Sequence, residues 1–209
     1  MKRITGILCM FLGTAMILGA LCLFLHNRRE AEEAEVVCAD LLPQLVGVIE
    51  ERENTSTEPE TYAQPVGTPV EYLDPAAFKM TEVVINGYPY IGYLSIPKLE
   101  LELPIMADWT YNRLRIAPCR YTGSVRGEDL VLMAHNYSTH FGGLSKLEEG
   151  DSVLFTDMDG IVTAYQVMEQ DVVDPYAVEE VTSGDYDLTL FTCTYGGQSR
   201  VTVYCDRIS

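Results

Sequence analysis

The sequence predicts an all-β domain over residues 81–209, folded as a barrel of about eight short strands. Short apolar runs recur throughout this region and are separated by turn residues. Asn86-Gly87 and residues 157–160 each stand between two such runs, as the turns of β-hairpins do. Residues 99–105 alternate between apolar and polar or proline positions, which is typical of a half-buried strand. A closed or nearly closed barrel is the simplest fold that hides the edges of so many short strands.

The predicted strands follow one another with little helix between them. In chain order they are residues 83–85, 90–96, 99–105, 130–134, 153–155, 162–168, 188–193 and 201–205. The run 130–134 is apolar throughout, so we expect it at the centre of the sheet. Only short helices fit elsewhere, around residues 112–116 and 142–147.

A membrane segment precedes this domain. Residues 4–25 carry no charge, and a helix of that length spans about 33 Å, enough to cross a bilayer core. A cleavable signal peptide is the alternative, but the apolar run is long and no small-residue cleavage site precedes His26. We therefore expect an uncleaved anchor over residues 1–29. Basic residues flank both of its ends, so they favour a cytoplasmic N-terminus only weakly.

Two segments join the anchor to the domain. Residues 30–53 predict an amphipathic helical stalk, lying beside the domain or the membrane, which Pro43 kinks or splits. Its apolar positions recur at helical spacing: Ala34, Val37, Leu41, Leu45 and Val48. Residues 54–80 are rich in proline and polar residues and predict a linker.

The charge of the chain excludes some partners. All 31 acidic residues follow residue 29, and the net charge is −17. Such a charge repels nucleic acid and anionic lipid surfaces, so we expect neither as a partner, and we attribute the charge to solubility. We expect no metal, because the acidic residues nearest to a calcium-like cluster lack the spacing of a binding loop: Asp157, Asp159, Glu169 and Asp171.

The six cysteines do not form a disulfide framework. Three lie in the anchor and stalk, and the domain holds an odd set of three: Cys119, Cys193 and Cys205. Cys119 and Cys205 could pair, which would leave Cys193 free. An unpaired thiol outside the cell calls for a chemical role.

Cys193, His135 and Arg200 each stand at the end of a predicted strand. A neighbouring imidazole or cation favours the reactive thiolate, and the imidazole can then protonate a leaving amine. Arg200 falls on the strand expected to pair with that of Cys193, where its guanidinium could stabilise an oxyanion. These three groups predict acyl transfer through a thioester. The rival base is His140, in a polar loop.

The residues around these groups resemble the motifs of sortases, the membrane-anchored cysteine transpeptidases of Gram-positive bacteria. Residues 189–193 read Thr-Leu-Phe-Thr-Cys and resemble the sortase signature Thr-Leu-x-Thr-Cys. Residues 134–136 read Ala-His-Asn and are similar to the sortase Gly-His-Asn, with Ala134 in place of glycine. Arg200 resembles the arginine that begins the last sortase strand. The likeness extends over about residues 83–208.

This resemblance implies an eight-stranded sortase β-barrel with short helices, anchored with its N-terminus in the cytoplasm and its catalytic domain outside the cell. It implies that Cys193 attacks a C-terminal sorting motif of a surface protein. The acyl group then passes to an amine of a peptidoglycan precursor or a pilin. His135 would be the general acid and base, and Arg200 would position the substrate and stabilise the oxyanion. No cofactor is implied. The neighbours that we expect to bind substrate are Thr192, Asn136 and Thr194.

The sortase class is less clear from the sequence. The long N-terminal segment favours a class B-like or unclassified sortase, although the interval between His135 and Cys193 leaves little room for the inserted helix of class B. Asp74-Pro75 resembles the lid motif of pilin-polymerising class C sortases, but Ala76 follows where an aromatic residue is expected. No hydrophobic tail follows Ser209, which also argues against class C.

Two other functions fit the same residues. A thiol hydrolase or peptidase would release the acyl group to water, and a wall-binding barrel would have no catalysis. The second is disfavoured because the cysteine, histidine and arginine are all present. The resemblance to sortases implies that the acidic stretch 168–184 leads toward the substrate groove, and its charge indicates a basic flank on the substrate.

Overall fold

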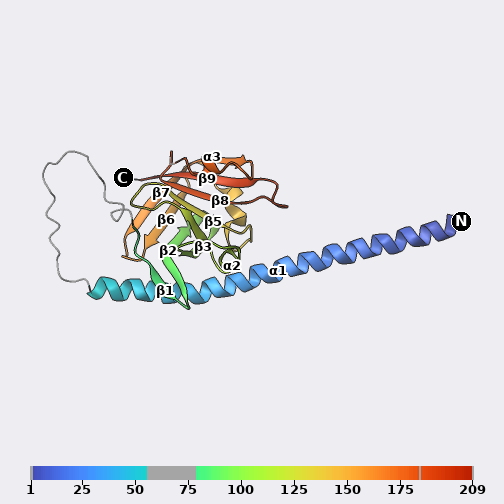
Figure 1. The fold of residues 1–209 in the computed structure, drawn as a ribbon, viewed down its shortest axis with the longest axis horizontal. Helices are drawn as coiled ribbons and strands as arrows, with labels where there is room; N and C mark the ends of the chain where they lie inside the picture. The colour runs from blue at the N-terminus through green and yellow to red at the C-terminus, as the bar shows by residue number, and fades with distance from the viewer. Residues whose placement is uncertain (1, 56–78, 184, 209) are drawn as a thin grey trace.

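The structure is a computed structural model that describes residues 2–55, 79–183 and 185–208. Its elements are α1 (Lys2–Thr55), β1 (Val83–Ile85), β2 (Tyr88–Ile96), η2 (Pro97–Leu99), β3 (Leu101–Met106), α2 (Tyr111–Leu114), β4 (Cys119–Thr122), β5 (Leu130–Ala134), η3 (Phe141–Lys146), β6 (Ser152–Asp157), β7 (Val162–Val173), α3 (Val178–Val181), β8 (Leu188–Cys193) and β9 (Arg200–Arg207). A long helix therefore leads into a domain made almost entirely of strands (Figure 1).

Strands β2 to β9 close into an eight-stranded barrel in the described part of the chain. The strand order is β1-β2-β3-β4-β5-β8-β9-β7-β6, and β2 also pairs with β6, which closes the sheet on itself. β3 pairs in parallel with β4, and β5 pairs in parallel with β8, while the other neighbours are antiparallel. The predicted fold class is confirmed.

The set of eight predicted strands differs from the eight barrel strands by one strand. The sequence counted β1, which is only the hairpin partner of β2 outside the closed ring, and it missed β4. β4 is four residues long, and only Cys119 in it is buried. So short and polar a strand has no apolar run, and pairing with β5 defines it instead.

The two predicted hairpins form. Asn86 and Gly87 connect β1 to β2 with φ angles of 52° and 83°, the left-handed pair that a two-residue hairpin turn requires. Between β6 and β7, the Asp157 carboxylate accepts hydrogen bonds from the backbone N–H groups of Asp159 and Ile161. These bonds satisfy backbone groups in the turn, which is why an aspartate begins it.

The strand β5 lies between β4 and β8, and four of its five residues are buried, so its predicted central place is confirmed. The predicted alternation in β3 holds only at its start, because Leu103, Pro104, Ile105 and Met106 are all buried. Helix α1 contacts β3 and covers its outer face, which buries both faces of this strand (Figure 1).

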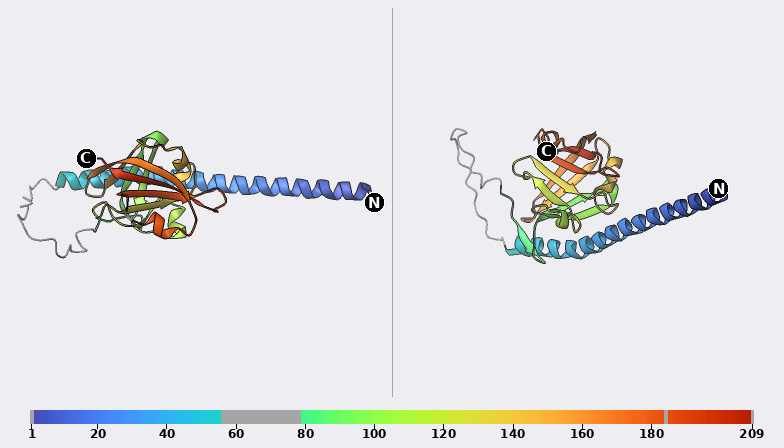
Figure 2. Two further views of the ribbon diagram at one scale, coloured as in Figure 1. Left: turned by 90° about the horizontal axis from the view of Figure 1, so that it is seen from above. Right: turned by 45° about the vertical axis from the view of Figure 1, so that its right-hand side comes forward.

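Helix α1 joins the predicted anchor and stalk into one helix that Pro43 does not split (Figure 2). Pro43 is exposed on the side away from the barrel, so its ring and missing N–H do not disturb the packed face. The buried residues of this face are Ala34, Cys38, Leu41, Leu45 and Ile49. The predicted stripe was therefore wrong at Val37, which is 38% exposed, while Val48 is partly buried and packs against the core.

The N-terminal part of α1 extends beyond the barrel (Figures 1 and 2). It is long and apolar enough to span a membrane, with a mean hydropathy of 2.0 over 18 residues, none of them buried in the protein. The other segment predicted between anchor and domain, the linker with Asp74-Pro75, lies outside the described residues except at its two ends.

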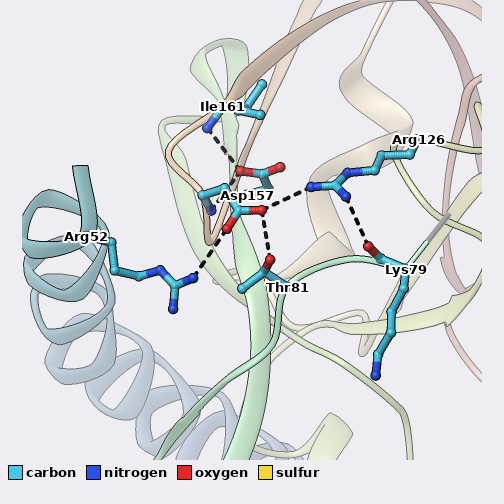
Figure 3. Close-up of polar contacts among 7 residues, drawn as sticks. Arg52, Lys79, Thr81, Arg126, Asp157 and Ile161 are labelled. Carbon is cyan, nitrogen blue, oxygen red and sulfur yellow. Dashed lines mark hydrogen bonds and ion pairs between the residues drawn. The ribbon is translucent and has the colours of Figure 1, made fainter. Parts of the chain in front are cut away.

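The C-terminal end of α1 is held to the barrel at Asp159 of the β6–β7 turn, whose partners Arg52, Thr81 and Arg126 are labelled in Figure 3. Its carboxylate accepts hydrogen bonds from Thr81 Oγ1 at 2.8 Å and from Arg126 Nη2 at 3.1 Å. Arg52 of α1 approaches the same carboxylate at 3.5 Å. Because the arginines are partly exposed, each ion pair contributes about 1 kcal/mol or less, so this cluster fixes position more than it adds stability.

The three domain cysteines are free thiols, so Cys119 and Cys205 are not paired in the structure. Both are fully buried in the barrel core, where the lack of solvent raises the pKa of Cys119 to about 12 and also raises the pKa of Cys205. Their role is that of small apolar core residues.

Candidate active site

The parallel pairing of β5 and β8 sets the frame of the site. Ala134 of β5 lies opposite Thr192 of β8, and the Thr192 hydroxyl donates a hydrogen bond of 2.8 Å to the Ala134 carbonyl. Both strands run in the same direction, so the residue that follows each member of this pair lies at the same edge of the sheet. These next residues are His135 and Cys193, which are 58 positions apart in the sequence.

The antiparallel pairing of β8 and β9 brings in the third group, because Cys193 lies directly opposite Arg200. The turn between them is closed by Thr194 and Ser199, whose backbone and side-chain groups exchange hydrogen bonds of 2.9 to 3.1 Å. Gly196 and Gly197 supply the positive φ angles of the turn. Arg200 Nη1 donates to the carbonyls of Ser199 and Gly197 at 3.2 and 3.4 Å, which holds the guanidinium against the turn.

Cys193, His135 and Arg200 line one cavity of about 210 Å³. Its remaining walls are mainly apolar and aromatic and include Trp109, Tyr111, Tyr121, Phe191, Val178 and Val181. The Trp109 ring stacks on Tyr121 at a centroid distance of 5.9 Å, and Tyr121 meets Phe191 edge-on at 5.4 Å. An apolar cleft with a few polar groups at one end is suited to holding a peptide segment beside the thiol.

The imidazole of His135 is partly buried beside the ring of Tyr137, at a centroid distance of 4.9 Å. Burial lowers the pKa of His135, the carboxylate of Glu30 acts in the opposite direction, and Arg115 adds to the lowering. The net effect favours the neutral imidazole at neutral pH, the form that can accept a proton from a thiol.

His140 is excluded as the base by its place in the fold. Its side chain is fully buried, and Nε2 lies 3.6 Å from the thiol sulfur of Cys38 in α1. Burial lowers the pKa of His140 to about 4, with a smaller contribution from His135. It does not line the cavity of Cys193, so it joins the helix to the barrel instead.

The residues predicted to bind substrate lie at three different depths. Thr192 lines the cavity but is buried, and its hydroxyl is engaged by Ala134. Thr194 is half-buried within the β8–β9 turn. Asn136 is exposed in the loop after β5. A role of these three residues in substrate binding stays a prediction.

Sequence reasoning did not single out the aromatic wall. Trp109, Tyr111 and Tyr121 come from the segment between β3 and the end of β4, and only the closed sheet brings them to Cys193. Their one signal in the sequence is the clustering of the single tryptophan with Tyr111. The segment after β7 also reaches the cavity, with Asp174, Pro175 and Val178, in agreement with the expected course of the acidic stretch.

A family model for the sortase domain matches residues 94–208, which is more than half of the chain. This chain belongs to the sortase family. Comparison with curated proteins gave no match.

Solved sortase C structures share the fold. Sortase C from Streptococcus pneumoniae is 25% identical over 81% of this chain and 97% of its own, with a TM-score of 0.56. Sortase C from Clostridium perfringens SM101 is 25% identical over 85% and 90%, with a TM-score of 0.53. Sortase C1 of GBS Pilus Island 1 is 28% identical over 57% of this chain and 64% of its own, with a TM-score of 0.51. This chain thus spans less than two thirds of the length of that sortase C1. These similar structures are sortases C, whereas the sequence favoured a class B-like or unclassified member.

Proposed function

We propose that this chain is a membrane-anchored cysteine transpeptidase, which cleaves the C-terminal sorting motif of a surface protein and transfers the acyl group to an amine. The observation that carries the proposal is that Cys193, His135 and Arg200 line one cavity, at the ends of three paired strands. The matching sortase domain covers all three residues.

The first half of the reaction forms a thioester. The thiol proton of Cys193 passes to His135, and the thiolate attacks the carbonyl carbon of the scissile amide. The tetrahedral oxyanion is stabilised by the guanidinium of Arg200, which lies opposite Cys193 across the β8–β9 pair. When the intermediate collapses, the C–N bond breaks and the protonated His135 gives its proton to the leaving amine.

The second half releases the product. An acceptor amine attacks the thioester carbonyl and loses a proton to His135, and the Cys193 sulfur leaves as the thiolate. The acceptor is an amine of a peptidoglycan precursor or of a pilin. The similar sortase C from Streptococcus pneumoniae is described by its pilin substrate specificity, which supports the pilin amine as a candidate.

The position of the cavity supports action close to a membrane. The β8–β9 turn lies at the end of the barrel nearer to the N-terminal part of α1 (Figures 1 and 2). The loop after His135 contacts α1 at Glu30 and Ala31, only a few residues beyond the apolar segment. With the N-terminus in the cytoplasm, the barrel and its substrates lie on the outer face of the membrane.

The experiment that tests this function is intact-mass spectrometry of the full chain in detergent, incubated with a pool of sorting-motif peptides. We expect an acyl adduct on Cys193, released as a hydroxamate by hydroxylamine. Cys193→Ala should carry no adduct, and Cys205→Ala, which removes a buried thiol of the same barrel, should still acylate. An adduct that persists in Cys193→Ala would refute the proposal, and so would a folded chain with reduced Cys193 that no peptide acylates.

The thiol hydrolase is separated from the transpeptidase by the fate of the acyl group. The same reaction is run with and without an amine acceptor, either a glycine peptide or a lysine-containing peptide. A new amide that grows with amine concentration supports transpeptidation. Release of the free acid at the same rate in every sample would mean that water is the acceptor and that the enzyme is a hydrolase.

A further inference from the structure

The loop that follows His135 rests on helix α1. Tyr137 donates a hydrogen bond of 3.4 Å from its hydroxyl to Oε2 of Glu30, and the Thr139 hydroxyl donates to the carbonyl of Ala31 at 3.3 Å. Burial and the Glu30 carboxylate raise the pKa of Tyr137, so its hydroxyl stays a donor. Two side chains of the loop therefore hold one turn of the helix.

The same loop holds Tyr137 in a fixed place against the imidazole of His135. The Tyr137 ring lies between the rings of His135 and His140, at centroid distances of 4.9 and 5.4 Å. Its carbonyl accepts hydrogen bonds from the backbone of His140 at 3.0 Å and of Gly142 at 2.9 Å. A Cβ on Gly142 would lie 2.6 Å from the carbonyl oxygens of Asn136 and Tyr137, so the loop is closed too tightly for another residue there.

A second contact with α1 lies two turns further along the helix. The Cys38 thiol lies 3.6 Å from Nε2 of His140 and donates to the carbonyl of Ile116 at 3.3 Å. Ala34 and Cys38 are buried in this contact, and Glu30 is partly buried at its membrane-proximal end. Between Glu30 and Cys38 the helix therefore contacts three residues of this loop: Tyr137, Thr139 and His140.

We propose that Glu30 of α1 is a positioning residue for His135, because it fixes Tyr137 against the imidazole and places a negative charge near it. The docked helix then has a part in catalysis besides membrane anchoring. This inference rests on the proposed role of His135 as general acid and base. Glu30 acts through Tyr137 and the electric field, without contact to the substrate.

The groups that surround His135 make Glu30 the one carboxylate among its main electrostatic neighbours. Glu30 favours the protonated imidazole, and Arg115, after α2, opposes it. The other titratable groups around the imidazole belong to its own loop, to the barrel strands and to the cavity wall: Tyr137, His140, Cys193, Arg200, Tyr111 and Asp174. Asp174 lines the cavity but is not among the charges that shift His135.

The test measures His135 directly in the full chain, reconstituted in lipid nanodiscs. The chain has three histidines, so ¹³C-labelled imidazole signals can be assigned with His26→Gln and His140→Gln. These variants serve for assignment alone, because His26 Nε2 itself lies 3.6 Å from Oε1 of Glu30. We expect Glu30→Gln to lower the pKa of His135, because the carboxylate that favours imidazolium is lost. The midpoint of any activity limb that follows protonation of His135 should move to lower pH. We expect kcat for the acylating peptide to fall by about three- to tenfold, with KM unchanged, the range that the loss of one ordinary hydrogen bond gives.

Matched variants separate positioning from general charge and from folding. Glu33→Gln removes a carboxylate charge three residues further along the same helix, and it should leave the pKa of His135 unchanged. Tyr137→Phe keeps the ring but removes the hydroxyl that holds Glu30, and it should reproduce part of the Glu30→Gln effect on kcat. Glu30→Asp keeps the charge, and it should restore most of the titration.

Two results would overturn the inference. One is a His135 titration in Glu30→Gln that matches the parent chain, and the other is an equal shift in Glu33→Gln. The titration does not depend on turnover, so it can be read even if no peptide acylates the chain. Acylation that requires Cys193 together with an unmoved titration would leave the proposed function in place and remove only the role of Glu30.

Discussion

His135 and His140 show how the surroundings of a side chain decide its role. They are five residues apart in one loop, but His135 lines the cavity with Cys193, whereas His140 is enclosed between the barrel and Cys38 of α1. Burial lowers the pKa of His140 from 6.5 to about 4. Between these values the unfolded chain binds a proton that the folded chain does not, so the folded state loses stability as the pH falls.

We therefore predict that the free energy of unfolding falls by up to about 3 kcal/mol from His140 alone as the pH is lowered from 6.5 to 4. His140→Leu should remove this part of the pH dependence and keep Cys193 acylation. The measurement is denaturant unfolding of both proteins in detergent at several pH values. Parallel curves for the two proteins would show that His140 does not titrate on unfolding, and the prediction would be wrong.

The sequence predicted the positions of the candidate site residues better than the individual contacts that each of them makes. Cys193, His135 and Arg200 could be placed because each stands at one end of a strand with a clear apolar run. Cys193 ends β8, His135 follows β5 and Arg200 begins β9. The contact of Thr192 could not be predicted in this way. Its hydroxyl donates a hydrogen bond to the Ala134 carbonyl across the parallel β5–β8 pair, and the pairing of strands is a property of the whole sheet. The aromatic wall depends on the same closure, so no spacing in the sequence indicates it.

Among the elements, α1 gives the sharpest test of packing. Leu45 is fully buried on its inner face, and Val37, which sequence periodicity placed on the same face, is 38% exposed. We predict that Leu45→Ala weakens the docking of α1 by about 2–4 kcal/mol, because a buried leucine is lost and a cavity remains. Val37→Ala should cost less than about 0.5 kcal/mol.

The rate at which the Cys38 thiol is alkylated measures the docking of α1 directly. Burial raises the pKa of Cys38 to about 12, so the thiol reacts only when the helix opens. Alkylation of each cysteine, followed by peptide mass spectrometry, should show Cys38 reacting at least about tenfold faster in Leu45→Ala than in the parent chain. Val37→Ala should match the parent. Equal rates in all three proteins would mean that α1 is not held by this face.

The errors at the element scale have a common cause. Periodicity found the helix 30–53 and its approximate face, but the barrel surface selects which residues of that face are covered. It covers Cys38 and Ile49 and leaves Val37 exposed. β4 was missed because its pairing with β5, more than its composition, makes it a strand. Both depend on contacts between distant segments, which a local pattern does not contain.

At the scale of the whole molecule, charge is the dominant long-range feature. The chain has 31 acidic and 14 basic residues. On the outer side of β7, β9 and the segment after α3, acidic residues surround a shallow groove: Glu169, Asp171, Glu180 and Asp185. Asp174, a few residues away, lines the cavity of Cys193. Acidic residues therefore lie both at this groove and at the cavity, and they should attract a peptide substrate with basic residues.

We predict that, among peptides with the same motif, a Lys-Lys flank gives a kcat/KM about tenfold higher than a Glu-Glu flank at low ionic strength. The ratio should fall to about twofold near 0.5 M salt, because salt screens the attraction between exposed charges, while kcat changes little. Initial acylation rates at four salt concentrations measure this. A preference that persists at high salt would indicate direct contacts with the flank, and no preference at any salt would mean that the acidic surface serves solubility alone.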